Sequence, residues 1–511
     1  MHGVRRLSRI LGLARADDRR VHALTLSLFL IGAALASSWA LPIVGWLSVV
    51  LVAIALTTLV VISLDPRSFA WLRLCAFTLL VIAHLFWVGL MIVLSSVLAW
   101  SVPVWIWVFC ALSVIGAVGS AALRSTIRVP LVLPVGIAIA TLVGGWMRED
   151  GVIRCDDYLR VRASGSAVVV PSTPEVEHCV SGDSMMVERY PRQFWESPRG
   201  DGFLVTTQRG DHDLSPTGPR GRMAGVWFSG AVCRVNVERG APPQCLGDGK
   251  SDAIAESPLW DRLYATVHDA KKTTIYVLPR DGSIRPVAEV ELPVKAGVLY
   301  FDDQENIIGL CEDDALQVYH LDAHDLKSLG SAPAPFTTNQ VRYDQRSHEG
   351  IACAAMGPFR RIGGQAFAAV AYRGNPFSYR PLASSAEYPS SWLAATWGCD
   401  WDPMARRAYV AVASLGLLET IDYDSGRILK RSFIGPGVRS VLFDPRRGLI
   451  YAGFFLSGDV IAIDEHSGAV IDRWFAGRFL RQLAFSRDQT SLLVTSILGI
   501  VRLPLRATPA S

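Results

Sequence analysis

The N-terminal part of the chain is built from long apolar stretches that lack charge. No Asp, Glu, Lys or Arg occurs within 21–64 or within 74–123. A helix crosses the hydrocarbon core of a bilayer with about 20 apolar residues, so each stretch is long enough for two spans. Pro42 and Pro103 divide the two stretches, and a further apolar run follows. The pattern predicts an all-α bundle of five membrane-spanning helices, at 22–40, 43–64, 74–98, 104–123 and 129–147.

Arginine placement predicts how these spans are oriented. Residues 1–20 hold six Arg against two Asp, and arginines recur in the loops after the second and fourth spans. The other connections carry no charge. Positive residues in short loops stay cytoplasmic, so we expect a basic cytoplasmic segment over 1–20, a transmembrane bundle over 21–147 and an exoplasmic location for the rest of the chain.

The first span has a second interpretation. Its arginines, the apolar run 24–31 and the small residues at 34–36 also fit a cleavable signal peptide, and cleavage would leave four spans in the same orientation. His84 lies inside the third span, where an ionisable side chain is a candidate functional residue. Because no partner for a proton pathway stands out in these spans, we favour a neutral His84 bonded to backbone or Ser.

The pattern changes after residue 147. Short runs of Val, Ile, Leu, Tyr and Phe alternate with Gly, Pro, Asp and Ser, which predicts an all-β region. Equivalent residues recur at a spacing of 42, as in Asp402 and Asp444 or Tyr409 and Tyr451. About 42 residues per four-stranded unit is the period of a β-propeller blade.

The repeat predicts a seven-bladed propeller over 193–511. We place the blades at 193–250, 256–295, 296–337, 338–392, 393–437, 438–478 and 479–505. The last unit is one strand short, and the segment Tyr158–Val170 is well placed to supply that strand. Residues 148–192 therefore form an exoplasmic entry segment that includes the ring-closing strand.

The repeat motifs resemble a known group of propellers. The F-D-P turn followed by Tyr, and the I-D-x-x-S-G turn, are similar to those of the YVTN, NHL and quinoprotein-like β-propeller superfamily, clearly over 393–505 and more faintly over 256–336. The resemblance implies the fold and no particular chemistry. The segment 462–468 with Trp474 is similar to the docking motif of quinoprotein dehydrogenases. Ser432 replaces that Trp in the preceding unit, so no quinone cofactor is predicted.

No catalytic, metal-binding or cofactor-binding residues are predicted. Acidic clusters such as 312–314 lack the alternating order of a Ca²⁺ loop, and the histidines are scattered. Two cysteine pairs are candidate disulfides, because Cys233 and Cys245 bracket a predicted hairpin and Cys155 and Cys179 share the entry segment. The remaining exoplasmic cysteines are expected as small buried hydrophobes, namely Cys311, Cys353 and Cys399.

Composition and charge reduce the number of protein classes to which this chain could belong. Half of the residues are hydrophobic, 19% are charged and mean hydropathy is +0.30, which excludes a disordered chain. The net charge of +4 is concentrated in residues 1–20, so no nucleic-acid-binding face is expected. The 50 basic residues comprise 44 Arg and 6 Lys, a bias that fits a GC-rich bacterial genome. We therefore expect a multi-pass protein of the bacterial cytoplasmic (inner) membrane, with its C-terminal domain periplasmic or extracellular.

The resulting hypothesis is a membrane-anchored exoplasmic propeller that binds or scaffolds a protein, peptide or glycan partner, with the lipid bilayer as its second partner. An exoplasmic enzyme of lactonase, lyase or quinoprotein type is the alternative, and it requires three or more Asp, Glu, Asn or His side chains to converge at the ring axis. A third possibility is a sensor or transport component that works through the helical bundle, which requires a polar cavity around His84.

Overall fold

The computed structural model describes most of the C-terminal part of the chain. The described residues are 150–210, 222–236, 241–269, 272–312, 317–334, 338–354, 367–384, 396–413 and 416–505. The predicted spans and His84 lie outside them. The chain divides into two compact units, 1–148 with 213–218 and 149–212 with 219–511, and all described residues belong to the second. Among these residues, no helix combines the length and apolar character needed to cross a bilayer.

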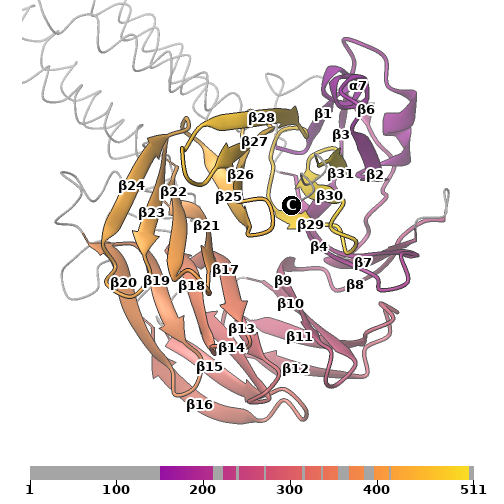
Figure 1. The fold of residues 1–511 in the computed structure, drawn as a ribbon. Helices are drawn as coiled ribbons and strands as arrows, with labels where there is room; N and C mark the ends of the chain where they lie inside the picture. Colours follow the sequence, from indigo (N-terminus) through magenta and orange to yellow (C-terminus); the bar gives the residue numbers. More distant parts are fainter. Residues whose placement is uncertain are drawn as a thin grey trace, which may run out of the picture. The chain divides into compact units, whose positions relative to one another are not determined.

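The described residues form seven four-stranded antiparallel sheets around a common centre (Figure 1). The first three sheets contain β4 (Arg189–Glu196), β5 (Gly202–Arg209), β7 (Val232–Asn236) and β8 (Gln244–Leu246); β9 (Lys250–Ser257), β10 (Arg262–His268), β11 (Thr273–Pro279) and β12 (Ala288–Leu292); and β13 (Ala296–Asp302), β14 (Ile307–Glu312), β15 (Gln317–Asp322) and β16 (Ser328–Pro333). The next three contain β17 (Thr338–Asp344), β18 (Glu349–Ala354), β19 (Phe367–Arg373) and β20 (Ser378–Ser384); β21 (Thr396–Asp402), β22 (Arg407–Val412), β23 (Leu417–Asp422) and β24 (Ile428–Phe433); and β25 (Val438–Asp444), β26 (Leu449–Phe454), β27 (Asp459–Asp464) and β28 (Val470–Phe475). This strand order is that of a β-propeller, so the predicted all-β propeller is confirmed.

The seventh sheet joins the two ends of the ring. It contains β29 (Leu483–Phe485), β30 (Ser491–Ser496) and β31 (Gly499–Pro504), and its outermost strand is β2 (Ala167–Pro171) from before the first sheet. The pairing of β2 with β31 is antiparallel. The entry segment thus supplies the missing strand, and the ring has no open junction between its first and last sheets.

The expected strand over Tyr158–Val170 is wrong in its first half. Residues Cys155–Ala163 form the helix α7, and only the second half is extended. Asp156 and Asp157 in the first turn and two arginines in the last turn favour a helix, because they oppose the partial charges of the helix ends. The chain then turns at Gly165, whose φ of +77° suits glycine, and enters β2.

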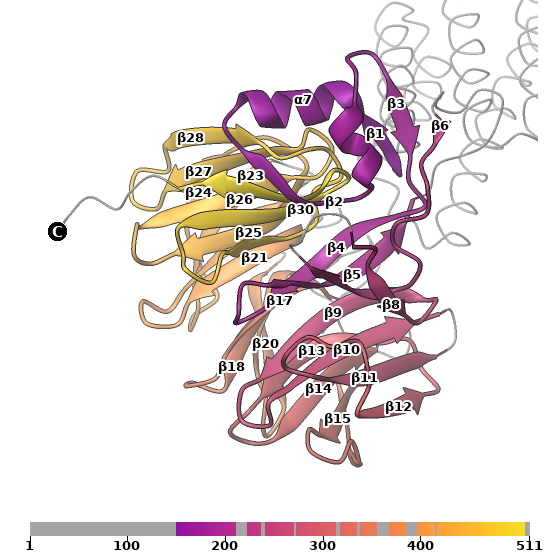
Figure 2. The same ribbon diagram turned by 90° about the vertical axis from the view of Figure 1, so that its right-hand side faces the viewer.

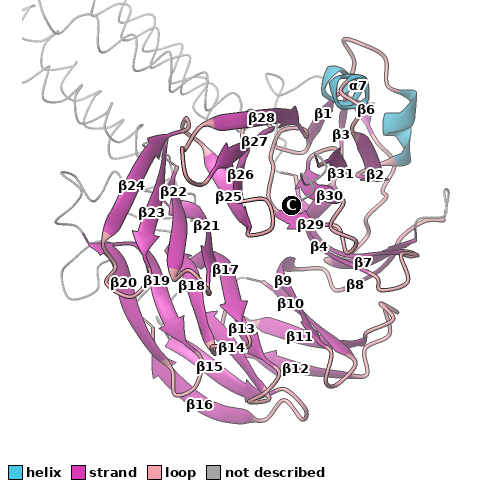
Figure 3. Cartoon of the chain, in the orientation of Figure 1, coloured by secondary structure: helices cyan, strands magenta, loops and turns pink. Residues whose placement is uncertain are grey.

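A small cap lies beside the seventh sheet (Figure 2). It contains β1 (Val152–Arg154), α7, the short 3₁₀ helix η3 (Pro174–His178), β3 (Ser184–Met186) and β6 (Arg222–Met223), and its three strands pair in the order β1-β3-β6. Among the described residues, helix is confined to α7 and η3 (Figure 3). Asp157 of α7 is bonded to Arg478 at 2.7 Å, so an ion pair fixes the cap to the ring.

Neighbouring sheets are joined by the aromatic residues of the repeat. The Tyr of a second strand packs on the Phe of the next sheet's first strand, with ring centroids 4.6 Å apart for Tyr409–Phe443 and 5.9 Å apart for Tyr451–Phe485. Such pairs contribute about 1 kcal/mol beyond the area they bury. The 42-residue repeat therefore reflects the contacts between neighbouring sheets as well as the strands of each sheet.

The structure contains both disulfides expected from the sequence, Cys155–Cys179 and Cys233–Cys245. The expectation for Cys353 and Cys399 is wrong, because these residues form a third disulfide between β18 and β21. They are 46 residues apart in sequence, and only the side-by-side packing of the fourth and fifth sheets brings them together. Cys311 is a buried thiol, as expected.

Ring closure depends on one close backbone contact, which a single substitution tests. Gly499 has a φ of +126°, and a Cβ there would lie 1.9 Å from the carbonyl oxygen of Val170 in β2. We expect Gly499→Ala to lower the free energy of unfolding by about 3 kcal/mol, because it combines backbone strain with a clash. The measurement is urea unfolding of the full chain in mild detergent, which the predicted spans require.

Gly448→Ala is the matched control, because Gly448 also has a positive φ, +62°, but open space where a Cβ would lie. Its expected loss is about 1 kcal/mol, the cost of a left-handed alanine. Equal losses in the two variants would show that the β2–β31 contact contributes nothing specific to ring stability.

Candidate functional site

The innermost strands share a feature at one end of the ring. Because every sheet repeats the same up-and-down order, the seven inner strands all begin at one end, which we call the entry end. In six of them the register with the second strand steps over one residue, forming a β-bulge. The residues stepped over are Arg192, Asp252, Leu299, Asn339, Trp397 and Arg439. Bulges re-aim side chains and are enriched near functional sites.

Two of these residues take part in an arginine–aromatic arrangement. The Arg439 guanidinium lies 5.2 Å from the ring centroid of Trp397, and Trp397 meets Phe455 edge-on at 6.3 Å. The Arg481 guanidinium lies 4.5 Å from the Phe455 ring, which packs on Phe479 at 5.4 Å. We call these five residues the Arg–aromatic cluster. Trp397 and Arg439 are half-buried, so each keeps a surface open to solvent.

Arg481 also connects the cluster to the start of the described chain. Its guanidinium lies 3.7 Å from the Asp150 carboxylate and donates to the Tyr190 hydroxyl at 3.3 Å. Tyr190 in turn donates to Asp150, and Gln208 donates to the second carboxylate oxygen. Burial raises the pKa of Tyr190, so its hydroxyl stays a donor at neutral pH. Asp150 is therefore held by three side chains at the entry end.

Farther along the inner strands, two side chains of β17 cross to other sheets. The Gln340 amide donates to the Val441 carbonyl of β25 at 2.9 Å and accepts from the Val441 N–H at 3.4 Å. Arg342 donates to the Leu483 carbonyl of the seventh sheet at 3.4 Å. Gly398 lets β21 approach β25 closely beside this crossing, since a Cβ there would lie 3.0 Å from the Ser440 backbone. The fourth sheet is thus bonded to the sixth and seventh near the axis.

One buried carboxylate lies beside this crossing. Asp400 accepts the Phe443 N–H at 2.8 Å and the Trp401 N–H at 2.9 Å, and Arg342 lies 3.6 Å away. Burial raises the pKa of Asp400, while Arg342 and the two N–H groups oppose that rise without cancelling it. A carboxylate whose pKa is raised on folding lowers stability as pH increases through its folded pKa.

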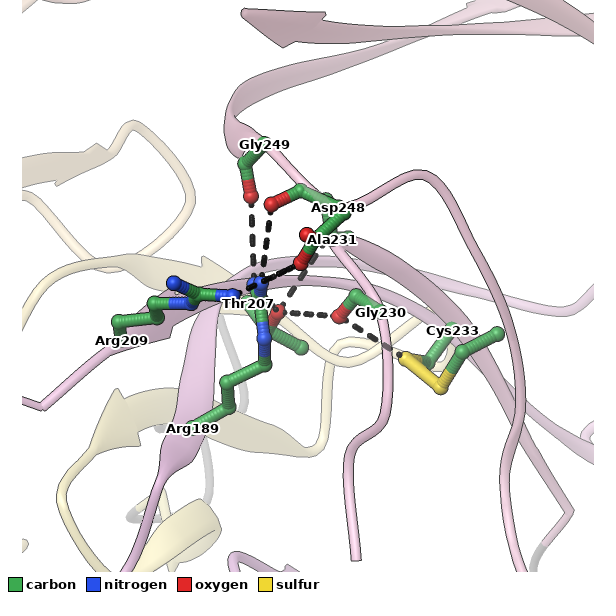
Figure 4. A network of polar contacts seen from close by, with 9 residues as sticks. Arg189, Thr207, Arg209, Gly230, Ala231, Cys233, Asp248 and Gly249 are labelled. Atoms are coloured by element: carbon green, nitrogen blue, oxygen red, sulfur yellow. Dashed lines mark hydrogen bonds and ion pairs between the residues drawn. A yellow bond between two sulfur atoms is a disulfide. The ribbon is translucent and has the colours of Figure 1, made fainter. Parts of the chain in front are cut away.

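The predicted Cys233–Cys245 disulfide belongs to a structural network (Figure 4). Buried Arg189 donates to the Asp248 carboxylate at 2.9 Å, to the Gly249 carbonyl at 3.2 Å and to the Thr207 hydroxyl at 3.3 Å. Thr207 donates to the Gly230 carbonyl at 2.6 Å, and the disulfide sulfur of Cys233 lies 3.5 Å from the same oxygen. Burial lowers the pKa of Arg189. These contacts bond the first sheet to the connection that leads into the second.

Two polar side chains reach the axis within the described part of the ring. The side chains described as crossing it are those of Gln340 and Arg342, with Asp400 as their acidic neighbour. Within the described ranges, no group of three or more His, Cys, Asp or Glu side chains is arranged to hold a metal ion. The enzyme alternative required three or more converging Asp, Glu, Asn or His side chains at the ring axis, and it stays an untested alternative.

None of the cluster residues was among the candidates from sequence, although a signal was present. Trp397, Arg439 and Arg481 are each separated by 42 residues, the period of the repeat. The periodicity therefore marks them as equivalent positions, two of them on the inner strands β21 and β25 and the third two residues before β29. His84, the intramembrane candidate, lies outside the described residues.

Comparisons with known proteins give only distant likenesses. No family model matches the sequence, and no curated protein matches it. Among solved structures, the AfRom2 CNH domain is similar over 67% of this chain and 100% of its own, with 11% identity and a TM-score of 0.44. The Myceliophteria thermophila Cps50 (Swd1) β-propeller domain covers 49% of this chain and 80% of its own, with 10% identity and a TM-score of 0.38.

The propeller fold rests on the strand order described above. The finer assignment to the YVTN, NHL and quinoprotein-like superfamily stays a prediction.

Removing Arg342 tests the electrostatics of the axis. In Arg342→Gln the buried Asp400 loses its cation, so its pKa rises further and its charged form becomes more costly. We expect the variant to lose about 2 kcal/mol of unfolding free energy at pH 8, with a smaller loss as pH falls and Asp400 becomes protonated. Urea titrations of the full chain between pH 5 and 8 measure this.

Two controls accompany this experiment. Arg346→Gln, at an exposed arginine, should leave stability unchanged. Adding Asp400→Asn to Arg342→Gln should abolish the pH dependence of the loss. A loss that is constant from pH 5 to 8 would show that Arg342 acts through packing and not through Asp400.

Proposed function

We propose that this chain is a membrane-anchored β-propeller whose entry end binds a protein or peptide partner on the exoplasmic side of a bacterial cytoplasmic membrane. The predicted spans would supply the anchor, and the lipid bilayer would be their partner. The β-bulge repeated in six inner strands supports the binding role, because it aims Trp397 and Arg439 to the same end of the ring.

The residues at the entry end indicate the chemistry of the partner. Trp and Arg are the residue types most enriched among the energetically dominant positions of protein interfaces. Half-buried Arg439 brings a guanidinium group beside the Trp397 ring, whereas Arg481 is already bound to Asp150. Guanidinium groups bind carboxylates through paired hydrogen bonds. We therefore favour a partner segment that combines acidic side chains with an apolar residue over a neutral glycan.

Labelled peptides test this proposal. The peptides share one apolar core and carry glutamates, glutamines or lysines at the same positions, and binding to the full chain in lipid nanodiscs is followed by fluorescence anisotropy. We expect the glutamate peptide to bind about tenfold more tightly than the glutamine peptide, with the difference shrinking at high salt.

Variants link that binding to the entry end. Arg439→Gln and Trp397→Ala should each weaken binding of the glutamate peptide about tenfold, while the exposed control Arg346→Gln should not change it. Equal affinity for the glutamate and glutamine peptides, or normal binding by Arg439→Gln, would contradict the proposal.

Reporter fusions test the proposed location. Alkaline phosphatase and a cytoplasm-folding fluorescent protein are each placed after Ser511 in bacterial cells. An odd number of spans with a cytoplasmic N-terminus predicts active phosphatase and a dark fluorescent protein. Inactive phosphatase with a bright fluorescent protein would mean an even number of spans and a cytoplasmic propeller.

A further inference from the structure

The cap contains a cavity that is separate from the Arg–aromatic cluster. Its volume is about 320 Å³, and Cys155, Cys179, His178, Asp183 and Arg222 are among the residues that line it. This size is at the lower end of pockets that bind small molecules. The wall of the cavity therefore includes both halves of the Cys155–Cys179 disulfide, together with one acidic and one basic side chain.

The three disulfides differ in how they can be reached. Cys353 and Cys399 are both completely buried. In the Cys233–Cys245 disulfide, Cys233 is completely buried and Cys245 is half-buried. Cys179 is half-buried between the exposed residues His178 and Val180. Thiol–disulfide exchange requires a thiolate to approach one sulfur directly, so access to the sulfur controls its rate. Cys155–Cys179 combines a half-buried sulfur with a place in the wall of the cavity, so a small thiol can be held directly beside it.

The two sulfurs of this disulfide are not equivalent. Cys155 is 1% exposed and is the first residue of α7, whereas Cys179 follows η3 near the surface. A helix N-terminus stabilises a thiolate, which makes Cys155 the better leaving group. The carboxylates next to it are already engaged, because Asp156 accepts the Ser181 hydroxyl at 2.6 Å and Asp157 pairs with Arg478. Attack is therefore expected at Cys179.

The charged side chains around the cavity favour a thiol that carries both a positive and a negative group. Exposed Arg222 is paired with Glu175 at 3.2 Å and presents a cation to a carboxylate, with His178 nearby. Asp183 presents an anion to an ammonium group. A zwitterionic aminothiol, such as the amino acid cysteine, matches this lining better than a neutral thiol of similar size.

We propose that the Cys155–Cys179 disulfide is a redox-active site that exchanges with small zwitterionic thiols. The thiolate attacks Sγ of Cys179 and forms a mixed disulfide, while the electron pair of the broken bond goes to Sγ of Cys155, which takes up a proton. A second thiolate attacks the sulfur of the bound thiol, releases the small disulfide and leaves Cys179 as a thiol. Two small thiols are oxidised for each protein disulfide reduced.

Exchange would act on the cap. The disulfide ties the start of α7 to the segment after η3, and Tyr158 and Val161 of α7 belong to the same hydrophobic cluster as Val460 and Phe475 of the sixth sheet. The ion pair Asp157–Arg478 and the contact of Arg160 over Phe475 at 3.9 Å persist without the disulfide. Reduction should therefore loosen η3 and the residues between it and β3, and leave β2 paired with β31 and the ring closed.

Timed exchange on the full chain in mild detergent tests the proposal. The protein is incubated with cysteine, quenched in acid and alkylated, and the modified peptides are quantified by mass spectrometry. We expect Cys155 and Cys179 to react at least about tenfold faster than the buried Cys353 and Cys399, and also faster than Cys233 and the half-buried Cys245, with the first mixed disulfide on Cys179. Equal rates for all three disulfides, or first attack on Cys155, would overturn the proposal.

Variants separate access from recognition. Cys155→Ser leaves Cys179 as a lone thiol, which should hold cysteine as a stable mixed disulfide after oxidation. At equal thiolate concentration, cysteine should react about threefold or more faster than 2-mercaptoethanol. Arg222→Gln should remove that advantage, and the exposed control Arg346→Gln should keep it. Equal rates for the two thiols with the parent protein would overturn the assigned ligand class.

Discussion

The pairing of β2 with β31 is the constraint on which the rest of this propeller depends. Each sheet buries its faces against its two neighbours, so the first and last sheets remain incompletely covered unless the ring closes. A strand of five residues from before the first sheet closes it, and the close approach of Gly499 to Val170 sets its position. The side chains that cross the axis can make their contacts only when the ring is closed. Arg342 reaches the Leu483 carbonyl because the seventh sheet is held in place opposite the fourth.

Contacts between neighbouring sheets explain most of the residues that recur in the sequence. The Tyr–Phe pairs, the aspartate-bonded turns and the bulges recur because each sheet must meet the next in the same way. Where a residue departs from the repeat, the sheets make a contact that the other sheets do not share. Gly398 stands where the next two repeats have Ser440 and Gln482, and its missing side chain lets β21 approach β25 beside the bond from Gln340 to Val441. The departures from periodicity therefore concentrate polar contacts at the axis of the fourth to seventh sheets.

Much of this fold could be predicted from the sequence, because the period of 42 encodes strands, turns and sheet contacts together. Two disulfides could also be anticipated, since their cysteines share a hairpin or a short segment. Cys353–Cys399 could not, because its partners meet only through packing of adjacent sheets. The helix α7 was missed because the need for a closing strand outweighed its favourable end charges. Trp397, Arg439 and Arg481 were detectable by their spacing alone, but what their side chains touch follows from bulges that no local pattern reveals.

The segment between Asp150 and Met186 combines three roles that are usually separate. Its first residue is held by Arg481 and Tyr190 at the entry end, its middle supplies the ring-closing strand, and its disulfide lines the cap cavity. Loosening the segment at Cys179 leaves β2 paired with β31, since that pairing relies on backbone bonds of its own. The anchor of Asp150 likewise depends on side chains of the ring. A change of redox state would therefore alter the surface of the cap while the arrangement of the Arg–aromatic cluster, which rests on the closed ring, stays the same.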